Sequence, residues 1–408
     1  MSSSTTPFPA PPRLARRLSL SGRLMLTLLR RIAMGRLEFQ TPTGERVAHQ
    51  AAAAGPDARI VLHRWRMLRR LVFGGDVGFA ESFMDGDWSS PDLPAVIEFA
   101  SLNQGALGRA IEASPPMRLL NRLLHLRRAN TKTGSRRNIE EHYDLGNDFY
   151  AQWLDAGMAY SSALYREPGA SLEDAQTAKL ARVTELLGVA GGELVLEIGC
   201  GWGGLAEHLI RAAGCHVTGV TLSPSQLAFA QARLTQAGLA ASADLRLQDY
   251  RDTAGQFDRV VSIEMFEAVG EDYWGTYFAR LRDRLRAGGV AVLQVITIAD
   301  DKFDSYRSSP DFIQRYIFPG GMLPSPTALR RVIDAAGLVL QHEENFGHSY
   351  AATLAEWRRR FQRAWPHLTK LGFDERFRRK WDYYLAYCEG GFRAGAIDVG
   401  LYCLTHRA

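Results

Sequence analysis

The 408-residue sequence is poor in the features that mark secreted, metal-binding and membrane-spanning proteins. Its four cysteines, Cys200, Cys215, Cys388 and Cys403, are scattered and lack the spacing of metal ligands or of a redox pair. No apolar run approaches the ~20 residues that span a bilayer. The first residues, MSSSTTPFPAPP, lack the apolar core of a signal peptide. These absences predict a cytoplasmic protein with reduced thiols and no metal site.

Acidic residues are missing from one stretch near the N-terminus. Between Arg13 and Arg36 the chain has arginines interleaved with leucines and no Asp or Glu, although the net charge of the whole chain is only +5. Basic clusters follow at 63–70 (HRWRMLRR) and 125–137 (HLRRANTKTGSRR). Arginine among leucines favours a helix in an anionic membrane interface over a nucleic-acid groove. A solvated helix with a core-facing leucine stripe is the alternative. We therefore predict peripheral binding to the inner face of the cell membrane, and no nucleic-acid partner.

Composition and pattern divide the chain into parts. Apolar residues make up 46% and charged residues 23% of it, as in ordinary globular proteins. In the N-terminal part, helices are predicted at 13–35 and 91–113 and short strands at 36–41 and 58–63. The predicted parts are a disordered tail (1–12), a smaller mixed α+β domain for membrane or lipid docking (13–125), a basic linker (126–137) and a catalytic domain (138–408).

From residue 138 onward, strand and helix patterns alternate, which is typical of an α/β domain with a Rossmann-like sheet between helices. The predicted strands are 193–199, 216–222, 245–250, 257–263, 290–298, 338–344 and 396–406. The predicted helices are 173–187, 203–213, 224–238, 273–286 and 326–336. Residues 351–390 predict one or two amphipathic helices before the last strand.

The motif VLEIGCGWGG (195–204) joins the first of these strands to a helix. Glycines let the backbone turn sharply and let a ligand approach without meeting a Cβ, although a purely structural turn is the alternative. Glu197 would repel a pyrophosphate and suits a cationic amino group. The motif therefore favours S-adenosylmethionine over a dinucleotide. Cys200 has no histidine arranged to activate it, so we interpret it as a turn residue.

The next two strand ends offer further cofactor contacts. A dinucleotide fold would place Asp or Glu after the second strand. This chain has TLSPSQ there, so we expect Thr221 and Gln226 to bind the ribose hydroxyls. After the third strand, QDYRD places Asp249 and Tyr250 where the adenine ring would lie.

Several longer motifs occur in one order along the chain. They are IEEHYDLGNDFY (139–150), MAYSSALY (158–165), GVTLSPSQ (219–226), MFEAVG (265–270), DFIQRYIFPGGMLPS (311–325) and ENFGHSY (344–350). With these motifs the chain resembles the cyclopropane-fatty-acyl-phospholipid synthase family of S-adenosylmethionine-dependent methyltransferases over residues 60–408. The resemblance implies the class I methyltransferase fold, with a mixed seven-stranded sheet and an acyl-chain-binding insertion at about 299–350. The expected cofactor contacts are Tyr160, Ser161, Glu197, Gly199, Cys200, Gly201, Gly203, Thr221, Leu222, Gln226, Asp249, Tyr250 and Arg251.

The substrate that the resemblance implies is a phospholipid with a cis double bond in an acyl chain. An isolated alkene is a poor nucleophile, so the electrophilic methyl group has to be held in line with it. Attack on the methyl gives a carbocation, and loss of a proton from that methyl closes a cyclopropane ring. Aromatic faces stabilise cations, and Tyr316, Phe318, Phe346 and Tyr350 are candidates, with core packing as the alternative role.

The resemblance also implies a base, which in this family is a bicarbonate held by a Glu, a Tyr, a His, a Cys and the backbone near an Ile. Glu267, Tyr350 and Ile296 match three of these positions. The cysteine position is Ser162 and the histidine position is Gln294, and both side chains can still hydrogen-bond an oxyanion. Glu264 is an additional carboxylate, and one carboxylate can replace the anion. We expect all six residues in the catalytic centre.

Alternatives remain at this point. Proton loss in another direction would give a methyl- or methylene-branched chain, as in a 10-methyl or furan fatty acid precursor. The N-terminal region also fits a membrane-binding protein with a degenerate catalytic domain, although the intact cofactor motifs and Glu267 argue against it. A nucleic-acid methyltransferase would show an NPPY-type loop or a nucleophilic Cys where MFEAVG stands. Members of the family often form homodimers, and the sequence does not decide this.

Overall fold

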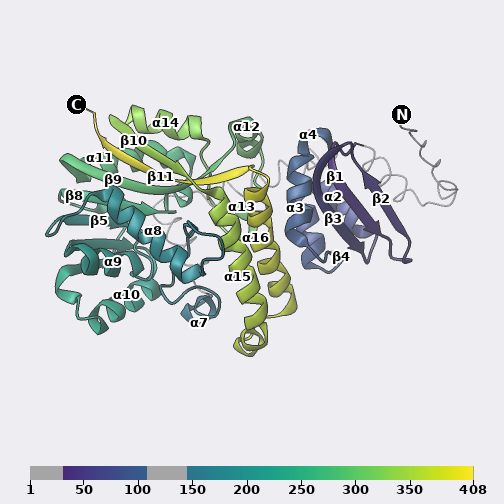
Figure 1. The fold of residues 1–408 in the computed structure, drawn as a ribbon, viewed down its shortest axis with the longest axis horizontal. Coiled ribbons are helices and arrows are strands. Elements are labelled where there is room, and N and C mark those ends of the chain that lie inside the picture. The colour runs from purple at the N-terminus through teal and green to yellow at the C-terminus, as the bar shows by residue number, and fades with distance from the viewer. Residues whose placement is uncertain (1–30, 108–144, 408) are drawn as a thin grey trace, which may run out of the picture. The chain divides into compact units, whose positions relative to one another are not determined.

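The computed structural model describes residues 31–107 and 145–407 (Figure 1). These residues fall into two compact units, which are described separately. The predicted tail at 1–12, the predicted linker at 126–137 and most of the predicted helix at 13–35 lie outside the described residues.

The first unit contains a four-stranded sheet in the order β2-β1-β3-β4. The strands are β1 (Met34–Gln40), β2 (Arg46–Gln50), β3 (Ala53–Leu62) and β4 (Trp88–Ser89). The predicted strands at 36–41 and 58–63 correspond to β1 and to the end of β3. The prediction of a helix through residue 35 is wrong, because Met34 pairs with β3. The Asn103 side chain also accepts hydrogen bonds from the N–H groups of Ala33 and Met34.

In residues 31–107, three helices accompany this sheet: α2 (Arg66–Met84), α3 (Leu93–Leu102) and α4 (Gln104–Leu107). α2 was not predicted, because Gly75 has a positive φ of 60° and breaks the helical periodicity in its middle. The basic cluster at 63–70 begins this helix. Arg66 hydrogen-bonds the fully buried Asp87 through two nitrogens, and Arg70 contacts Asp85. Part of the positive charge in this cluster is therefore neutralised inside the unit.

The second unit is built on a seven-stranded sheet in the order β10-β11-β9-β8-β5-β6-β7. The strands are β5 (Leu194–Ile198), β6 (His216–Thr221), β7 (Ala243–Leu247), β8 (Phe257–Ile263), β9 (Leu285–Ile298), β10 (Leu338–Asn345) and β11 (Ile397–His406). β11 pairs antiparallel with β9 and β10, and the pairs among β5 to β9 are parallel. All seven predicted strands are present in a mixed sheet of Rossmann-like class I topology, as predicted.

Two predicted strand boundaries are wrong by three residues or more. β9 begins at Leu285 and not at residue 290, so it includes residues 285 and 286, which were predicted to be helical. The strand predicted to run to 250 ends at Leu247, because Asp249 caps the short 3-10 helix η4 (Tyr250–Asp252) and turns the chain out of the sheet. Asp249 accepts a hydrogen bond from the Arg251 N–H, an arrangement that favours a turn over a continuing strand.

The five helices predicted between strands are α8 (Leu172–Leu187), α9 (Gly204–Ala213), α10 (Pro224–Gln236), α11 (Trp274–Arg284) and α14 (Pro326–Ala335). Ser171, Ser223 and Ser325 cap α8, α10 and α14 by accepting a backbone N–H, which explains where these helices begin. The segment at 351–390 forms α15 (Gly347–Leu368) and α16 (Glu375–Arg393), which run side by side (Figure 1).

The shorter helices of this unit are α7 (Asn147–Tyr150), α12 (Asp300–Ser308) and α13 (Phe312–Tyr316). α12 and α13 lie in the segment predicted to bind an acyl chain. None of the helices in the described part of the chain is long and apolar enough to cross a membrane.

The order of the strands places the candidate site. β5 lies between β6 and β8. The chain runs from β5 through β6 to β7 on one side and then returns to β8 on the other side of β5. In open α/β sheets, ligands bind outside the carboxyl ends of the strands at such a switch point. The loops that follow β5 and β8 begin at Gly199 and Glu264, and both carry residues that the sequence singled out.

Candidate active site

The loop after β5 is a tight turn with positive φ at Gly199 (88°), Gly201 (49°) and Gly203 (80°). A Cβ on Gly199 would lie 3.0 Å from Met265 Cγ, and one on Gly203 would lie 2.9 Å from Ala230 Cβ. A Cβ on Gly201 would meet nothing within 4 Å. Two of the glycines are therefore required for packing as well as for backbone conformation, and the third faces open space that a ligand can approach.

Glu197 lies at the end of β5 and is 4% exposed. Its Oε2 has no hydrogen-bond partner among the described residues. Burial raises the pKa of Glu197 to about 8, and the Lys179 ammonium opposes this shift. A buried carboxylate with a free oxygen is well placed to receive a cationic group.

Cys200 is buried within the turn. Burial, and next the charge of Glu197, raise the pKa of the Cys200 thiol well above its usual range. A thiolate is therefore disfavoured, in agreement with the interpretation of Cys200 as a turn residue and not a nucleophile.

The segment that follows α7 holds Tyr160, Ser161 and Ser162. The Tyr160 hydroxyl is 2.8 Å from the Tyr384 hydroxyl of α16, and its ring contacts Trp357 and Phe318. The Ser161 Oγ accepts a hydrogen bond of 2.8 Å from Lys179 Nζ of α8. Contacts to α8, α15 and α16 thus hold this segment in place.

The predicted ribose and adenine contacts lie after β6 and β7. The Thr221 hydroxyl donates to Gln226 Oε1 at 3.0 Å, and both residues are buried. Leu222 between them is half-buried. Asp249 accepts two hydrogen bonds from the Arg251 guanidinium, which also lies 5.6 Å from the centre of the Tyr250 ring. The structure therefore pairs these residues with one another at the edge of the predicted cofactor site.

The loop after β8 begins with Glu264, which takes a positive φ of 48° that is uncommon outside glycine. Its Oε1 accepts hydrogen bonds from the Ser162 N–H at 2.8 Å and from Gln294 Nε2 at 2.7 Å. Its Oε2 accepts the Tyr350 hydroxyl at 2.6 Å. Three of the other five residues expected in the catalytic centre thus donate to the Glu264 carboxylate.

Glu267 and Ile296, the other two residues of that set, contact each other. Its Oε1 accepts the Ile296 N–H at 2.5 Å, and its Oε2 has no hydrogen-bond partner among the described residues. Glu264 and Glu267 are both half-buried, so each retains surface that a substrate can reach.

The two carboxylates differ in their electrostatic surroundings. Burial, and next the charge of Glu264, raise the pKa of Glu267 to about 8. Burial also raises the pKa of Glu264, but hydrogen bonds from Tyr350, Ser162 and Gln294 oppose the shift. With a pKa of about 8, Glu267 is mostly protonated near neutral pH, whereas the three hydrogen-bond donors favour the charged form of Glu264 against the effect of burial.

The four candidate aromatic residues are not equivalent. Tyr350 lies in the carboxylate cluster and packs on Phe392, with 4.5 Å between the ring centres. Phe346 is 2% exposed and belongs to the core. Tyr316 and Phe318 are half-buried, and Phe318 lies between Tyr160 and Tyr384.

Sequence reasoning missed Lys179, which is 2% exposed and contacts the Ser161 hydroxyl. A signal for it was present. The buried residues of α8 include Leu172, Gln176, Lys179 and Val183, at the spacing of one helix face. A lysine on that stripe points into the protein.

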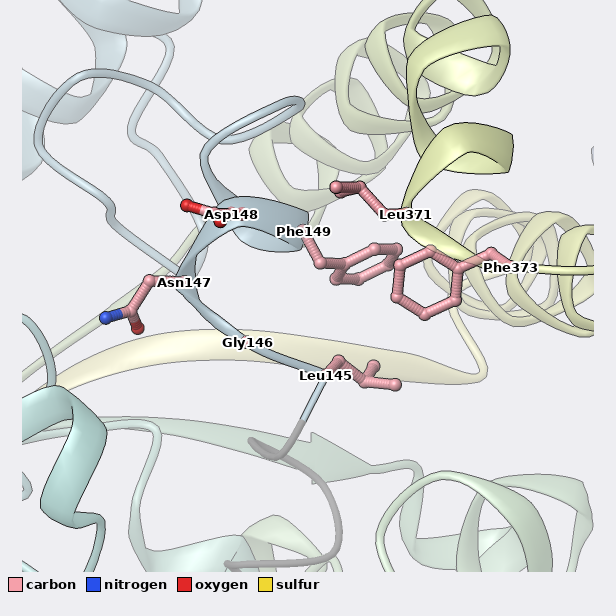
Figure 2. A pocket seen from close by; sticks show the side chains of 7 residues that line it. All are labelled: Leu145, Gly146, Asn147, Asp148, Phe149, Leu371 and Phe373. Atoms are coloured by element: carbon pink, nitrogen blue, oxygen red, sulfur yellow. The ribbon is translucent and has the colours of Figure 1, made fainter.

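Figure 2 shows a hollow beside α7. Its lining residues are Leu145, Gly146, Asn147, Asp148, Phe149, Leu371 and Phe373. The Asn147 side chain points away from Leu371 and Phe373 (Figure 2), and its Oδ1 accepts the indole N–H of Trp202 at 2.8 Å. One wall of the hollow thereby supports the turn after β5. Among residues 31–107 and 145–407, no group of three or more His, Cys, Asp or Glu side chains could hold a metal ion.

Comparisons with known proteins agree with this geometry. The family model described as mycolic acid cyclopropane synthetase matches residues 130–401. The tuberculostearic acid methyltransferase UfaA1 of Mycobacterium tuberculosis is 40% identical over 378 residues, which cover 85% of this chain and 83% of that protein. The cyclopropane-fatty-acyl-phospholipid synthase of Escherichia coli K12 is 38% identical over 337 residues, 81% of this chain and 83% of that protein.

A solved structure extends the likeness to three dimensions. The mycolic acid cyclopropane synthase CmaA1 complexed with SAH and CTAB is 30% identical, with a TM-score of 0.62 over 66% of this chain and 97% of that one. The protein is thus an enzyme, an S-adenosylmethionine-dependent methyltransferase that modifies lipid acyl chains. By its sequence motifs, its sheet order and these matches, the chain belongs to the mycolic acid cyclopropane synthetase family.

Proposed function

We propose that the enzyme transfers a carbon from S-adenosylmethionine to the cis double bond of an acyl chain in a membrane phospholipid and closes a cyclopropane ring. The observation that carries this proposal is the carboxylate of Glu264, held by three donors beside the cofactor turn. Met265, the next residue, packs on Gly199 of that turn. A proton acceptor therefore lies close to the predicted position of the reacting methyl group.

The cofactor supplies an electrophilic methyl group. The carbon–sulfur bond breaks as the alkene forms a bond to that carbon, and loss of a proton from the same carbon lets the second carbon–carbon bond close the ring. In our proposal Glu264 takes this proton through Tyr350, whose hydroxyl can accept a proton while donating its own to Glu264 Oε2. Burial and the charge of Glu264 raise the pKa of Tyr350 well above its usual range, so the hydroxyl stays protonated.

Bicarbonate does not fit this arrangement. The Gln294 amide and the Tyr350 hydroxyl both donate to Glu264. The Ser162 hydroxyl donates to the Ala163 carbonyl, and the Ile296 N–H donates to Glu267. The groups that the resemblance assigns to an anion are engaged by the protein's own carboxylates and by its backbone. We therefore assign the role of base to Glu264 and route no step through bicarbonate.

A methyl- or methylene-branched chain is the second candidate product. The relative that is 40% identical is named a methyltransferase and not a cyclopropane synthase. The first carbocation would be the same. A 1,2-hydride shift followed by loss of a proton would then give a methylene-branched chain, and a saturated methyl branch would need a later reduction.

The test uses the full-length protein, S-adenosylmethionine with a labelled methyl group and phospholipid vesicles. Vesicles with cis-monoenoic chains should acquire label, and vesicles with only saturated chains should not. Mass spectrometry of the fatty acid methyl esters then distinguishes a ring from a branch. Label in neither kind of vesicle, or in both equally, would contradict the proposal.

Cofactor binding should release a proton near neutral pH. With a pKa of about 8, Glu197 is mostly protonated in the free protein at pH 7. A bound ammonium beside it favours the carboxylate, so the pKa falls on binding. Affinity should therefore rise with pH until about pH 8 and then level off. Titration calorimetry at pH 7 in two buffers of different ionisation enthalpy should show release of nearly one proton, and the release should vanish in Glu197→Gln.

We also propose that the enzyme docks on the anionic inner face of the cell membrane. The support is the stripe of arginines and leucines between Arg13 and Arg36 and the basic cluster at 125–137, most of which lies outside the described residues. Each arginine near an anionic surface contributes about 1 kcal/mol. Replacing Arg16, Arg17 and Arg23 by Ser should weaken sedimentation with anionic vesicles roughly a hundredfold or more at low salt. Binding that ignores both salt and anionic lipid would refute the docking.

A further inference from the structure

Two side chains of α8 hydrogen-bond two different groups of Ser161. Gln176 Nε2 donates to the Ser161 carbonyl at 3.0 Å, and Lys179 Nζ donates to the Ser161 Oγ at 2.8 Å. All three residues are buried, with exposed fractions of 2% for Gln176, 2% for Lys179 and 6% for Ser161. Both the backbone and the hydroxyl of Ser161 are therefore fixed before any ligand binds.

The hydrogen bond from Lys179 determines whether the Ser161 hydroxyl donates or accepts its next hydrogen bond. An ammonium group has three donors and no acceptor, so the Ser161 oxygen has to accept from it. The hydroxyl hydrogen is then left to be donated elsewhere, with the ammonium strengthening its donor character. A donor that carries positive charge behind it suits an anionic acceptor, such as a carboxylate.

Lys179 also lies among acidic groups. Burial lowers the pKa of Lys179, but the charges of Glu264, Asp155 and Glu197 oppose this effect and favour the ammonium. Of these, Glu197 has a buried oxygen without a hydrogen-bond partner among the described residues. Glu197 on β5 and Lys179 on α8 are thus close enough to affect each other's charge, and Glu197 keeps an oxygen that a ligand can reach.

An α-amino acid presents the complementary pair of charges on a single carbon. We infer that Lys179 is a positioning residue for the methionyl end of S-adenosylmethionine, and that it acts through the Ser161 hydroxyl, which donates to the carboxylate while Glu197 receives the amino group. This inference rests on the proposed roles of Ser161 and Glu197 in cofactor binding. Lys179, Ser161 and Glu197 would together bind both charged groups of the amino acid, which the glycine turn alone does not do.

The test compares two ligands and needs no lipid, so its failure is distinct from a failure of the proposed reaction. One ligand is S-adenosylmethionine, and the other is its decarboxylated form, which keeps the sulfonium and the amino group. Lys179→Met should weaken binding of S-adenosylmethionine by roughly tenfold or more, as expected for the loss of a charge-assisted hydrogen bond. Binding of the decarboxylated form should change by less than about threefold. Calorimetry gives both dissociation constants.

Ser161→Ala should also weaken binding of S-adenosylmethionine more than binding of the decarboxylated form. Adding Lys179→Met to Ser161→Ala should cause little further loss, because both residues act on one hydrogen bond. Lys370→Met, at an exposed lysine of η7 (Thr369–Leu371), is the matched control and should change neither constant. If Lys179→Met does not fold, Ser161→Ala carries the comparison alone. Equal losses for the two ligands, or no loss for either, would overturn the inference.

Discussion

Glu264→Gly should lower turnover by about 10³-fold, the range expected when a general base is lost. The dissociation constant of S-adenosylmethionine should stay within about threefold of the original value, because Glu264 hydrogen-bonds Ser162, Gln294 and Tyr350 and not the glycine turn. Glycine accepts the positive φ of this position without strain. The loss is therefore expected to be catalytic and not conformational, and unfolding temperatures should confirm that the variant is folded.

The same variant offers a rescue experiment. Removing the Glu264 side chain leaves the Tyr350 hydroxyl without its acceptor and leaves Gln294 Nε2 with only its 3.3 Å hydrogen bond to the Ser162 carbonyl. A small carboxylate-like anion can then occupy the vacated space, so added bicarbonate should restore part of the activity of Glu264→Gly while leaving the original enzyme unchanged. Glu167→Gly, at an exposed loop position, is the matched control. Stimulation of the original enzyme by bicarbonate would contradict the assignment of Glu264 as the base.

Tyr350→Phe should lower turnover by about 10²-fold. The substitution removes the hydroxyl that donates 2.6 Å to Glu264 Oε2 but keeps the ring on Phe392. A loss of the proton route without a loss of packing should reduce kcat and leave the unfolding temperature within a few degrees. The measurement is the single-turnover rate of methyl transfer at saturating cofactor and lipid.

Tyr402→Phe is the control for this variant. Tyr402 is also buried, and its hydroxyl contacts Asn345 Oδ1 at 3.5 Å. It should keep nearly full activity. If Tyr350→Phe weakened cofactor binding as much as it slowed turnover, Tyr350 would have a binding role and the proposed proton route would be wrong.

Much of the fold could be predicted because local patterns and global packing agree. The apolar strands alternate with capped amphipathic helices, and Ser171, Ser223 and Ser325 begin three helices as their position in the sequence suggests. The helix α2 was missed because Gly75 interrupts its periodicity. The strand β7 was predicted too long because the side chain of Asp249 competes for the backbone.

The site was predicted as a set of residues but not as a hydrogen-bond network. Motif spacing places Glu264, Gln294 and Tyr350 at one end of the sheet, yet only the folded chain shows that Gln294 and Tyr350 donate to Glu264. The spacing of the buried residues of α8 marks the helix face that carries Lys179, but it does not show that Lys179 donates to the Ser161 hydroxyl. Contacts between distant segments set these hydrogen bonds, and no local pattern encodes them.

In the proposed reaction, a carbon from S-adenosylmethionine is joined to the double bond of a phospholipid acyl chain, and a proton is lost from that same carbon. Cofactor carrying a trideuterated methyl group tests this most directly, with vesicles of cis-monoenoic phospholipid and mass spectrometry of the released fatty acids. We expect a cyclopropane that keeps two of the three deuterium atoms. A product that keeps all three, or an acyl chain that acquires no deuterium, would contradict this expectation.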